Sequence, residues 1–272
     1  MPLKYRLYLL DIFNEMYIAS EFPESWKHFY IHMIERQGSN KVIPIALTSC
    51  ICKISEVMQK YRLEWWIEHN DLLPKVQSGF RKGRSCYDNL MYLVKQIDDA
   101  FIERNDVLTT FLDISDAFSN VVLEILLEKL ASIKCSELFI KFAKFLLEHR
   151  IAHTSITGFE ILNIYLGVPC GGVLSTICFI IYISIIGKKI PKQITVLKFA
   201  DDLALSINTE AHNMQSSILQ LENTIKIIKE KLHKHGLSLA PKKTKFVHFN
   251  KRGVEPGSIS LKVGNCSIPS CE

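Results

Sequence analysis

The 272-residue sequence lacks the cysteine patterns that hold metal ions or crosslink small secreted domains. None of its eight cysteines forms a CxxC pair; Cys50 and Cys52 are separated by a single residue, and Cys266 and Cys271 have no matching pair of histidines. These spacings exclude the common zinc modules. Scattered cysteines with apolar neighbours favour a reducing compartment over a disulfide framework.

An uninterrupted membrane-spanning run is also missing. Residues 161–187 carry no charged side chain, and a run of that length could cross a bilayer. Pro169, Gly171 and Gly172 interrupt it, so its continuous apolar part, residues 173–187, is short for a transmembrane helix. We therefore favour a buried helix in a large core, without membrane contact. A membrane-inserted apolar protein is kept as the alternative from another class.

Neither sign of charge is in large excess. The formal net charge is +5 and the isoelectric point is about 8.7, which permits nucleic-acid binding without demanding it. The sequence contains no internal repeat and no low-complexity segment. Its length suits one large domain or two modest ones.

What the sequence does contain is a pair of adjacent carboxylates between two apolar runs. Residues 194–199 and 203–207 are each predicted to form a strand, with Asp201 and Asp202 in the turn between them. A turn lets neighbouring side chains reach one ion, and hard divalent cations prefer carboxylate oxygens. By itself such a pair is more typical of a solvated turn, which is our interpretation of residues 98–99.

A second acidic position strengthens the metal hypothesis. Residues 107–112 form a β-prone run that ends at Asp113, and functional groups commonly lie at the carboxyl ends of buried strands. With Asp201 and Asp202 this makes three carboxylates. They could hold two Mg²⁺ ions about 3.5–4 Å apart, as in a polymerase.

The remaining elements follow from apolar periodicity. Helices are predicted at residues 4–21, 49–70, 86–104, 121–133, 136–149 and 209–235, and further strands at 244–249 and 259–263. In the second helix we expect Ile54, Met58, Tyr61 and Trp65 to form a buried stripe, in preference to a base-stacking platform. Thr209 is the expected N-cap of the last helix.

Two loops contain glycines, and the first is a candidate for contact with a nucleic-acid backbone. Residues 77–85 place the cations Arg81, Lys82 and Arg84 beside glycines, which let a main chain approach phosphate closely. The simpler interpretation of this segment is a solvated basic loop. The second loop, at residues 167–176, combines glycines with apolar residues.

The order of these motifs resembles that of reverse transcriptases. Asp113 with Phe118 five residues on, the glycine-rich block at 167–175 and the run Phe199-Ala200-Asp201-Asp202 follow one another along the chain. The resemblance is to reverse transcriptases of non-LTR retrotransposons, of the jockey-like kind, and extends from about residue 26 to residue 249. It implies an RNA-directed DNA polymerase that extends a DNA primer on an RNA template with deoxynucleoside triphosphates. The implied cofactors are two Mg²⁺ ions, or Mn²⁺ in their place.

The resemblance also implies roles for individual residues. Asp113, Asp201 and Asp202 would be the catalytic metal ligands. Phe118 would lie under the sugar of the incoming nucleotide, where its ring excludes a ribose 2′-OH. Ordinary core packing is the simpler role for Phe118, and the two roles are compatible.

Further contacts with the nucleotide would come from Arg36 and Lys243, of which Lys243 would lie near the departing pyrophosphate. A solvated basic turn is the other interpretation of Lys243. The residues expected against template and primer are Gly79, Arg81, Lys82, Arg84, Gly171 and Gly172.

Four positions depart from the family's pattern. Ile43 stands where the family has a triphosphate-binding arginine, and Cys170 stands where it has a glutamine near the nucleotide or template. Ser119 replaces an aspartate that is not a metal ligand, and Thr176 replaces a proline. A thiol cannot reproduce the paired donor and acceptor of an amide. The alternative hypothesis is therefore a degenerate, catalytically inactive copy that at most binds nucleic acid.

The implied fold is α+β, a right-hand polymerase with fingers and palm and with the thumb absent. Residues 1–25 would form an N-terminal helical extension, 26–106 the fingers region and 107–272 the palm, with a finger-like helical insertion at about 121–160. The order of elements predicts a split βαβ, ferredoxin-like antiparallel sheet in the palm. The thumb, and an endonuclease expected before Met1, would belong to the remainder of a mobile-element polyprotein.

Overall fold

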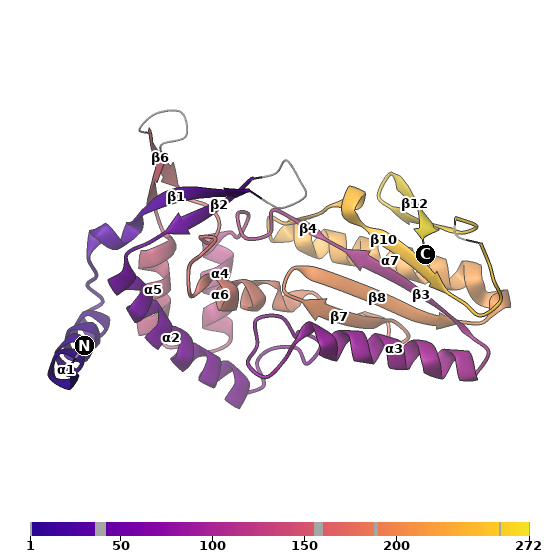
Figure 1. The fold of residues 1–272 in the computed structure, drawn as a ribbon, viewed down its shortest axis with the longest axis horizontal. Helices are drawn as coiled ribbons and strands as arrows, with labels where there is room; N and C mark the ends of the chain where they lie inside the picture. The colour runs from indigo at the N-terminus through magenta and orange to yellow at the C-terminus, as the bar shows by residue number, and fades with distance from the viewer. Residues whose placement is uncertain (1, 36–41, 155–159, 188–189, 256, 272) are drawn as a thin grey trace. The chain divides into compact units, whose positions relative to one another are not determined.

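A computed structural model describes residues 2–35, 42–154, 160–187, 190–255 and 257–271 (Figure 1). The chain divides into two compact units, each built from two separate stretches. The first unit comprises residues 1–72 and 118–182, and the second comprises residues 73–117 and 183–272. Contiguous boundaries after residues 25 and 106 do not describe this division, so the assignment of fingers and palm stays a proposal.

Most of the first unit is helical. Its helices are α1 (Leu3–Ala19), the 3₁₀ turn η1 (Glu24–Lys27), α2 (Cys50–His69), α4 (Leu123–Ser132), α5 (Glu137–Leu147) and α6 (Ser175–Tyr182). Serine hydroxyls begin two of them: Ser49 accepts from Cys52 N at the start of α2, and Ser136 accepts from Phe139 N at the start of α5. Every side chain of α6 except that of Thr176 is buried.

The apolar helix predicted at residues 173–187 is therefore shorter than expected, since α6 ends at Tyr182. Over the stretches that the structure describes, no helix combines the length and the apolar character needed to cross a membrane. The buried-helix prediction is confirmed for α6, and the membrane alternative is not favoured.

The first unit also contains a four-stranded sheet in the order β2-β1-β5-β6. The strands are β1 (His28–Glu35), β2 (Val42–Leu47), β5 (Arg150–Thr154) and β6 (Glu160–Ile164). β1 runs antiparallel to β2 and parallel to β5. Phe29, Ala46 and Ala152 form the buried cluster of this sheet.

The stripe predicted for the second helix is wrong. Ile54, Tyr61 and Trp65 of α2 are exposed, with 67% of Tyr61 and 63% of Trp65 accessible to solvent. The face that α2 buries instead consists of Cys52, Ser55, Glu56, Gln59, Leu63 and Ile67. Glu56 belongs to the buried face because its carboxylate accepts a main-chain hydrogen bond from Leu174 N at 3.0 Å. Apolar periodicity does not predict a hydrogen bond of this kind.

The second unit is organised around a six-stranded sheet in the order β11-β12-β10-β3-β8-β7. The strands are β3 (Asp106–Leu112), β7 (Thr195–Phe199), β8 (Asp202–Thr209), β10 (Lys245–Phe249), β11 (Ser260–Val263) and β12 (Cys266–Cys271). Within it, each neighbouring pair in the order β10-β3-β8-β7 is antiparallel, which is the predicted split βαβ order. β12, which the sequence reading missed, lies parallel to β10.

Two long helices of this unit cover opposite faces of the sheet. Gln96 of α3 (Cys86–Ile102) accepts a hydrogen bond from Ser206 of β8, whereas Ser217 of α7 (Met214–Lys234) donates to Thr209 of the same strand. Side chains alternate between faces along a strand, so residues 206 and 209 point to opposite sides. Asp202 shares the α3 face with Ser206 because their positions differ by an even number.

The start of α7 corrects a second prediction. Thr209 is not its N-cap: β8 continues to Thr209, the 3₁₀ turn η3 (Ala211–Asn213) follows, and α7 begins at Met214. The predicted helix is otherwise confirmed, and it buries apolar residues at helical spacing. These residues are Ile218, Leu221, Ile225, Ile228 and Leu232.

Short elements complete the second unit and place a lysine near the sheet's acidic end. η2 (Ile183–Ile185) precedes β7, and β4 (Ile114–Ser115) pairs with β9 (Ser238–Leu239). The 3₁₀ turn η4 (Pro241–Lys243) follows β9, and Ala240 N donates to Asp113 O at 2.9 Å. This pairing holds η4 beside the end of β3.

Candidate active site

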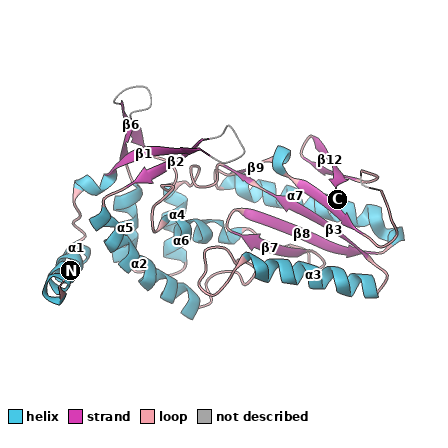
Figure 2. Cartoon of the chain, in the orientation of Figure 1, coloured by secondary structure: helices cyan, strands magenta, loops and turns pink. Residues whose placement is uncertain are grey.

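The acidic turn forms where β7 and β8 meet (Figure 2). Phe199, the last residue of β7, pairs with Asp202, the first residue of β8, and Ala200 and Asp201 lie between them. Ala200 has a φ of 56°, in the left-handed region that residues other than glycine rarely adopt. The predicted hairpin with an acidic turn is confirmed.

Asp113 reaches the same end of the sheet from the neighbouring strand. It directly follows β3, whose last residue, Leu112, pairs with Leu203 of β8. One step further along this register, Asp113 comes opposite Asp202. Asp113 and Asp202 line one cleft of about 420 Å³.

The rest of the cleft is mostly apolar. α3 contributes Cys86, Asn89, Leu90 and Leu93, and the strands and η4 contribute Phe111, Leu112, Leu197, Phe199, Leu203, Ala204 and Lys243. A concave apolar site with a few convergent charged groups is typical of a binding site. Asp113 and Asp202 therefore face a space that a ligand can enter.

The three carboxylates repel one another electrostatically. Partial burial raises the pKa of Asp201, and the nearby charge of Asp113 raises it further. Partial burial also raises the pKa of Asp202, and both Asp201 and Asp113 add to the effect. In both cases Lys243 acts in the opposite direction. The site thus gathers negative charge that a cation would stabilise.

Lys243 contacts this cluster directly. Its Nζ lies 2.8 Å from Asp113 Oδ2, and its side chain is 52% exposed. The resemblance placed Lys243 near a departing pyrophosphate, and in the structure its ammonium group offsets part of the charge on Asp113. Because the lysine side chain of this ion pair is half exposed to solvent, its exchange with another cation is inexpensive.

The donor chemistry of the cluster fits Mg²⁺, because three carboxylates offer the hard oxygen ligands that this ion prefers. Nowhere in the described parts of the chain do three or more histidine, cysteine, aspartate or glutamate side chains lie close enough to hold a metal ion. Asp113, Asp201 and Asp202 would have to converge further, with Lys243 leaving Asp113 Oδ2. The metal ligands therefore remain a proposal.

The loop at residues 77–85 uses its special residues to support the acidic turn. A Cβ on Gly79 would lie 2.0 Å from Ala200 N, so only glycine fits this approach. Arg81 is 8% exposed, and its guanidinium donates to Pro74 O at 3.2 Å and to Gln77 O at 3.3 Å. The structure thus places Gly79 and Arg81 in internal packing rather than on the outer surface of the loop.

The other two cations of this loop lie outside. Lys82 and Arg84 are exposed, and the guanidinium of Arg84 donates to Lys75 O at 2.6 Å. Both are accessible to a nucleic-acid backbone. Their contact with template or primer stays a prediction.

The glycine-rich loop of the first unit is held at both ends by buried charges. Arg150 donates to Leu166 O at 2.6 Å and to Gly167 O at 2.7 Å. Burial lowers the pKa of Arg150 to about 10, so the guanidinium stays charged at neutral pH. At the other end, Glu56 accepts from Leu174 N, and burial raises the pKa of this carboxyl group.

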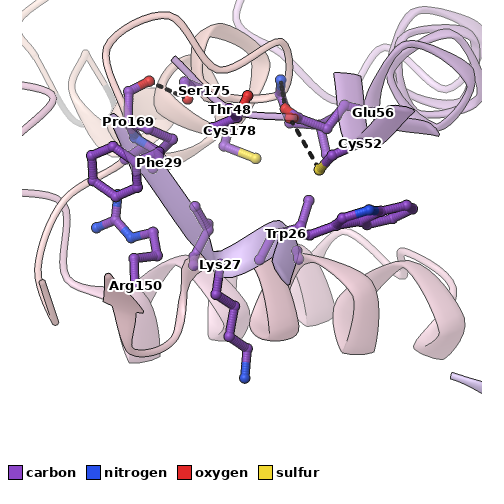
Figure 3. Close-up of a pocket in the computed structure, with 15 residues that line it drawn as sticks. Trp26, Lys27, Phe29, Thr48, Cys52, Glu56, Arg150, Pro169, Ser175 and Cys178 are labelled. Carbon is purple, nitrogen blue, oxygen red and sulfur yellow. Dashed lines mark hydrogen bonds between the residues drawn. The ribbon is translucent and has the colours of Figure 1, made fainter. Parts of the chain in front are cut away.

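Figure 3 shows the small cavity behind this loop, with Glu56 and Arg150 in its wall. Its volume is about 30 Å³. Ser175 donates to Pro169 O at 2.7 Å across the loop. Thr48 Oγ1 and Arg150 Nε line the same cavity, and neither has a hydrogen-bond partner among the residues that the structure describes. Two unpaired polar atoms beside a cavity of this size suit a bound water molecule.

The glycines of this loop also serve its own packing. Gly171 has a φ of 102°, and a Cβ there would come within 3.0 Å of Ala46 O. A Cβ on Gly172 would lie 2.5 Å from Ser175 Oγ. Cys170, which replaces the family's glutamine, accepts at its carbonyl oxygen from Ala46 N at 2.7 Å. Contact of Gly171 and Gly172 with template or primer stays a prediction.

Phe118 packs inside the first unit, as its simpler interpretation predicts. Its ring is stacked on Phe179 of α6, with centroids 4.6 Å apart. Its carbonyl oxygen accepts from Val168 N at 2.8 Å, beside the glycine-rich loop. A role under the sugar of a nucleotide stays a prediction.

Positions 36 and 43 are the two that the resemblance links to triphosphate binding, and the structure describes position 43. Arg36 lies outside the described residues. Ile43, which stands in place of the family's arginine, is a 40% exposed residue of β2 and pairs with Ile34. No cation therefore occupies position 43 itself.

Sequence reasoning missed Glu56, Gln77 and Arg150. All three are buried and bond to the main chain of a candidate site loop. The available signal was position: Gln77 stands two residues before Gly79, and Glu56 lies within the helix predicted at residues 49–70. Neither signal identifies the main-chain group that the side chain meets.

The sequence of this chain matches a known protein family. The family model described as reverse transcriptase (RNA-dependent DNA polymerase) matches residues 34–263. The chain therefore belongs to the reverse transcriptase family.

The chain is similar to proteins of mobile elements of Drosophila melanogaster. The chain is 26% identical over 232 residues to the probable RNA-directed DNA polymerase from transposon BS, covering 81% of this chain and 26% of that protein. It is 27% identical over 226 residues to the RNA-directed DNA polymerase from mobile element jockey, covering 78% of this chain and 25% of that protein. These matches confirm the predicted resemblance, and the chain spans about a quarter of each relative's length.

Solved structures show the same fold. The structure of apo telomerase from Candida tropicalis aligns with a TM-score of 0.62 at 13% identity, covering 99% of this chain and 52% of that chain. The telomerase from Candida albicans in complex with a TWJ fragment of telomeric RNA aligns with a TM-score of 0.58 at 12% identity, covering 96% of this chain and 48% of that chain. The fold is therefore a mixed α+β reverse transcriptase fold.

Proposed function

We propose that this chain carries RNA-directed DNA polymerase activity of the two-metal type. The 3′-OH of a primer attacks the α-phosphate of a deoxynucleoside triphosphate, and pyrophosphate leaves. The observation that supports this most is the meeting of Asp113 with the turn of Asp201 and Asp202 at one end of one sheet, where Asp113 and Asp202 line a single cleft.

The residues divide the work as follows. Asp113, Asp201 and Asp202 hold two Mg²⁺ ions, or Mn²⁺ in their place. When bound, the ions supply the positive charge that stabilises the attacking and leaving oxygens. Lys243, now on Asp113 Oδ2, turns toward the pyrophosphate as negative charge develops there.

The rest of the architecture follows from the same proposal. The six-stranded sheet is the palm and the four-stranded sheet belongs to the fingers. The RNA template and the DNA primer lie along surfaces that include Lys82 and Arg84. The thumb and the endonuclease belong to the rest of an element polyprotein, as the relatives' greater length allows.

A second candidate function is a degenerate copy that binds nucleic acid without extending primers. The specific observations in its favour are Ile43 and Cys170, which replace an arginine and a glutamine of the family's pattern. In both candidates the carboxylates keep their places. The two differ in whether the triphosphate is gripped.

A primer-extension assay on an RNA template separates these candidates. We expect Asp202→Asn to lower the rate at least about 100-fold, because several kcal/mol of metal-dependent stabilisation are lost. The matched control is Asp99→Asn, which alters the other adjacent aspartate pair, on the exposed surface of α3. Equal loss in both variants would refute the assignment of the site. Extension by neither the wild type nor its variants, with primer–template binding intact, would favour the degenerate copy.

A further inference from the structure

The side chain of Gln77 lies buried against the acidic turn. It is 2% exposed. Its Nε2 donates to Ala200 O at 3.3 Å, and its Oε1 accepts from Ala200 N at 3.2 Å. One amide side chain thus pairs both main-chain groups of the residue that precedes Asp201.

The main chain around Gln77 is aligned with β7 in the same way. Lys198 N donates to Val76 O at 3.0 Å, and Ser78 N donates to Lys198 O at 2.9 Å. Residue 77 therefore forms a parallel bridge with Lys198. The side chain of Gln77 continues this pairing to Ala200, two residues after Lys198. Ala200 lies beyond the end of β7, where regular strand pairing stops.

Gln77 is itself fixed before it meets the turn. Its Oε1 also accepts from Gly79 N at 3.0 Å, and its carbonyl oxygen accepts from the buried Arg81. Asn89 supports the same segment, because it accepts from Ser78 Oγ at 2.8 Å and donates to Lys198 O at 2.9 Å. The amide is therefore held in place rather than free to choose among rotamers.

The turn needs such support. Ala200 is 5% exposed, so its N–H and C=O would be costly to leave unpaired. Its left-handed conformation is unfavourable for a residue with a Cβ. The carboxylates of Asp201 and Asp202 also repel each other. Without an external partner the turn could relax in several directions.

We propose that Gln77 is a positioning residue that fixes Ala200 and thereby the direction of the Asp201 and Asp202 carboxylates. This inference rests on the proposed function, in which these carboxylates bind divalent metal. Gln77 touches neither the carboxylates nor the cleft. An amide suits this role, because it offers a donor and an acceptor side by side without charge at any pH.

Amide hydrogen exchange tests the positioning without any need for activity. In Gln77→Met, which keeps the volume and removes both hydrogen bonds to Ala200 together with the one from Gly79 N, we expect exchange at residues 200–202 to accelerate at least about tenfold. The control is Gln96→Met. Gln96 also bonds to the hairpin through two hydrogen bonds, at Ser206 and Asn208, far along β8 from the turn. That variant should leave exchange at residues 200–202 unchanged.

A second variant distinguishes positioning from general loss of structure. Gln77→Glu keeps an acceptor for Ala200 N and loses the donor to Ala200 O. We expect the amide of Ala200 to remain protected in Gln77→Glu and to lose protection in Gln77→Met. Equal protection of Ala200 in wild type and Gln77→Met, or equal loss in all three variants, would overturn the proposal. If Gln77→Met does not fold, Gln77→Glu is compared with Gln96→Met instead. Unaltered exchange at residues 201–202 in Gln77→Glu would then count against the proposal.

Binding of Mn²⁺, followed by electron paramagnetic resonance, connects the turn to the site. We expect Gln77→Met to weaken Mn²⁺ binding about tenfold or more and Gln96→Met to leave it unchanged. Tight binding that survives in Gln77→Met overturns the proposal. If the wild type binds no Mn²⁺, the proposed function fails, and the exchange data still decide whether Gln77 holds the turn.

Discussion

A single methyl group at Gly79 tests how closely the loop at residues 77–85 is fitted to the acidic turn. In Gly79→Ala the new Cβ would lie 2.0 Å from Ala200 N, 2.8 Å from Phe199 C and 2.9 Å from Ala200 Cα. Real Cβ atoms essentially never come within 3.0 Å of another heavy atom. The loop and the turn must therefore separate by on the order of 1 Å.

The expected cost follows from what Gly79 meets. Overpacking a core position costs about 1–3 kcal/mol, and occasionally more. The neighbours of Gly79 are main-chain atoms, which cannot rotate away, so we expect a loss of about 3 kcal/mol in the free energy of unfolding. For a chain of this size that corresponds to a fall of about 6–12 °C in Tm.

Gly83→Ala is the matched control, since it adds the same methyl group to the same loop. Gly83 has a φ of +72°, but nothing lies within 4 Å of its Cβ position. Its substitution costs about 1–2 kcal/mol of backbone strain and moves no neighbour. The two variants therefore separate steric displacement of the turn from strain within the loop.

Thermal unfolding and amide hydrogen exchange, measured for both variants, check this reasoning. Gly79→Ala should accelerate exchange in residues 199–203 and lower Tm more than Gly83→Ala does. If Gly79→Ala is as stable as Gly83→Ala, with unaltered exchange at the turn, the close approach of loop and turn is refuted.

Three further predictions concern the first unit. Burial raises the pKa of Glu56 above its ordinary value of 4.5. The contribution of Glu56 to stability is therefore complete below pH 4.5 and is lost as pH rises through the higher pKa of the folded state. The free energy of unfolding of wild type minus that of Glu56→Gln, from urea titrations, should fall as pH rises from 4.5, and a constant difference would contradict this. Phe118→Ala should admit ribonucleotides more readily in primer extension, and an unchanged ratio of ribonucleotide to deoxynucleotide incorporation would remove Phe118 from the sugar site. Ile43→Arg with Cys170→Gln should raise extension well above either single change, with the arginine contributing about 1.5–3 kcal/mol, roughly 10- to 100-fold, chiefly at low nucleotide concentration; efficient extension by the wild type with no gain in the double variant would exclude decay at these positions.

The hairpin of the acidic turn could be predicted because its signals are local. Two apolar strands on either side of Asp201 and Asp202 leave one arrangement in which both strands are buried. The strand before Asp113 was equally clear, since six of the seven residues of β3 are buried. Their meeting at one end of the sheet came from the resemblance to a family, because no local pattern specifies which strands become neighbours.

The face of α2 could not be predicted for a related reason. Apolar spacing favoured Tyr61 and Trp65 as core residues, and the helix instead buries Glu56 and Gln59. The carboxylate of Glu56 satisfies an amide of a loop more than a hundred positions away in the chain. Burial of a polar side chain depends on such a distant partner, so helical periodicity alone points to the wrong face.

The glycine-containing loops show that one residue pattern is compatible with phosphate binding and with internal packing. Glycines and cations in sequence indicate an approach to phosphate, and in the structure Gly79 and Arg81 serve the main chain of the protein itself. The two uses share one physical cause, because a main-chain carbonyl and a phosphate oxygen both attract donors and both require close approach. Lys82 and Arg84 remain at the surface of the same loop. The loop therefore interleaves internal residues that set its shape with external residues that carry its charge. Substitutions of the internal residues should change the geometry of the acidic turn. Substitutions of the external residues should change the salt dependence of nucleic-acid binding.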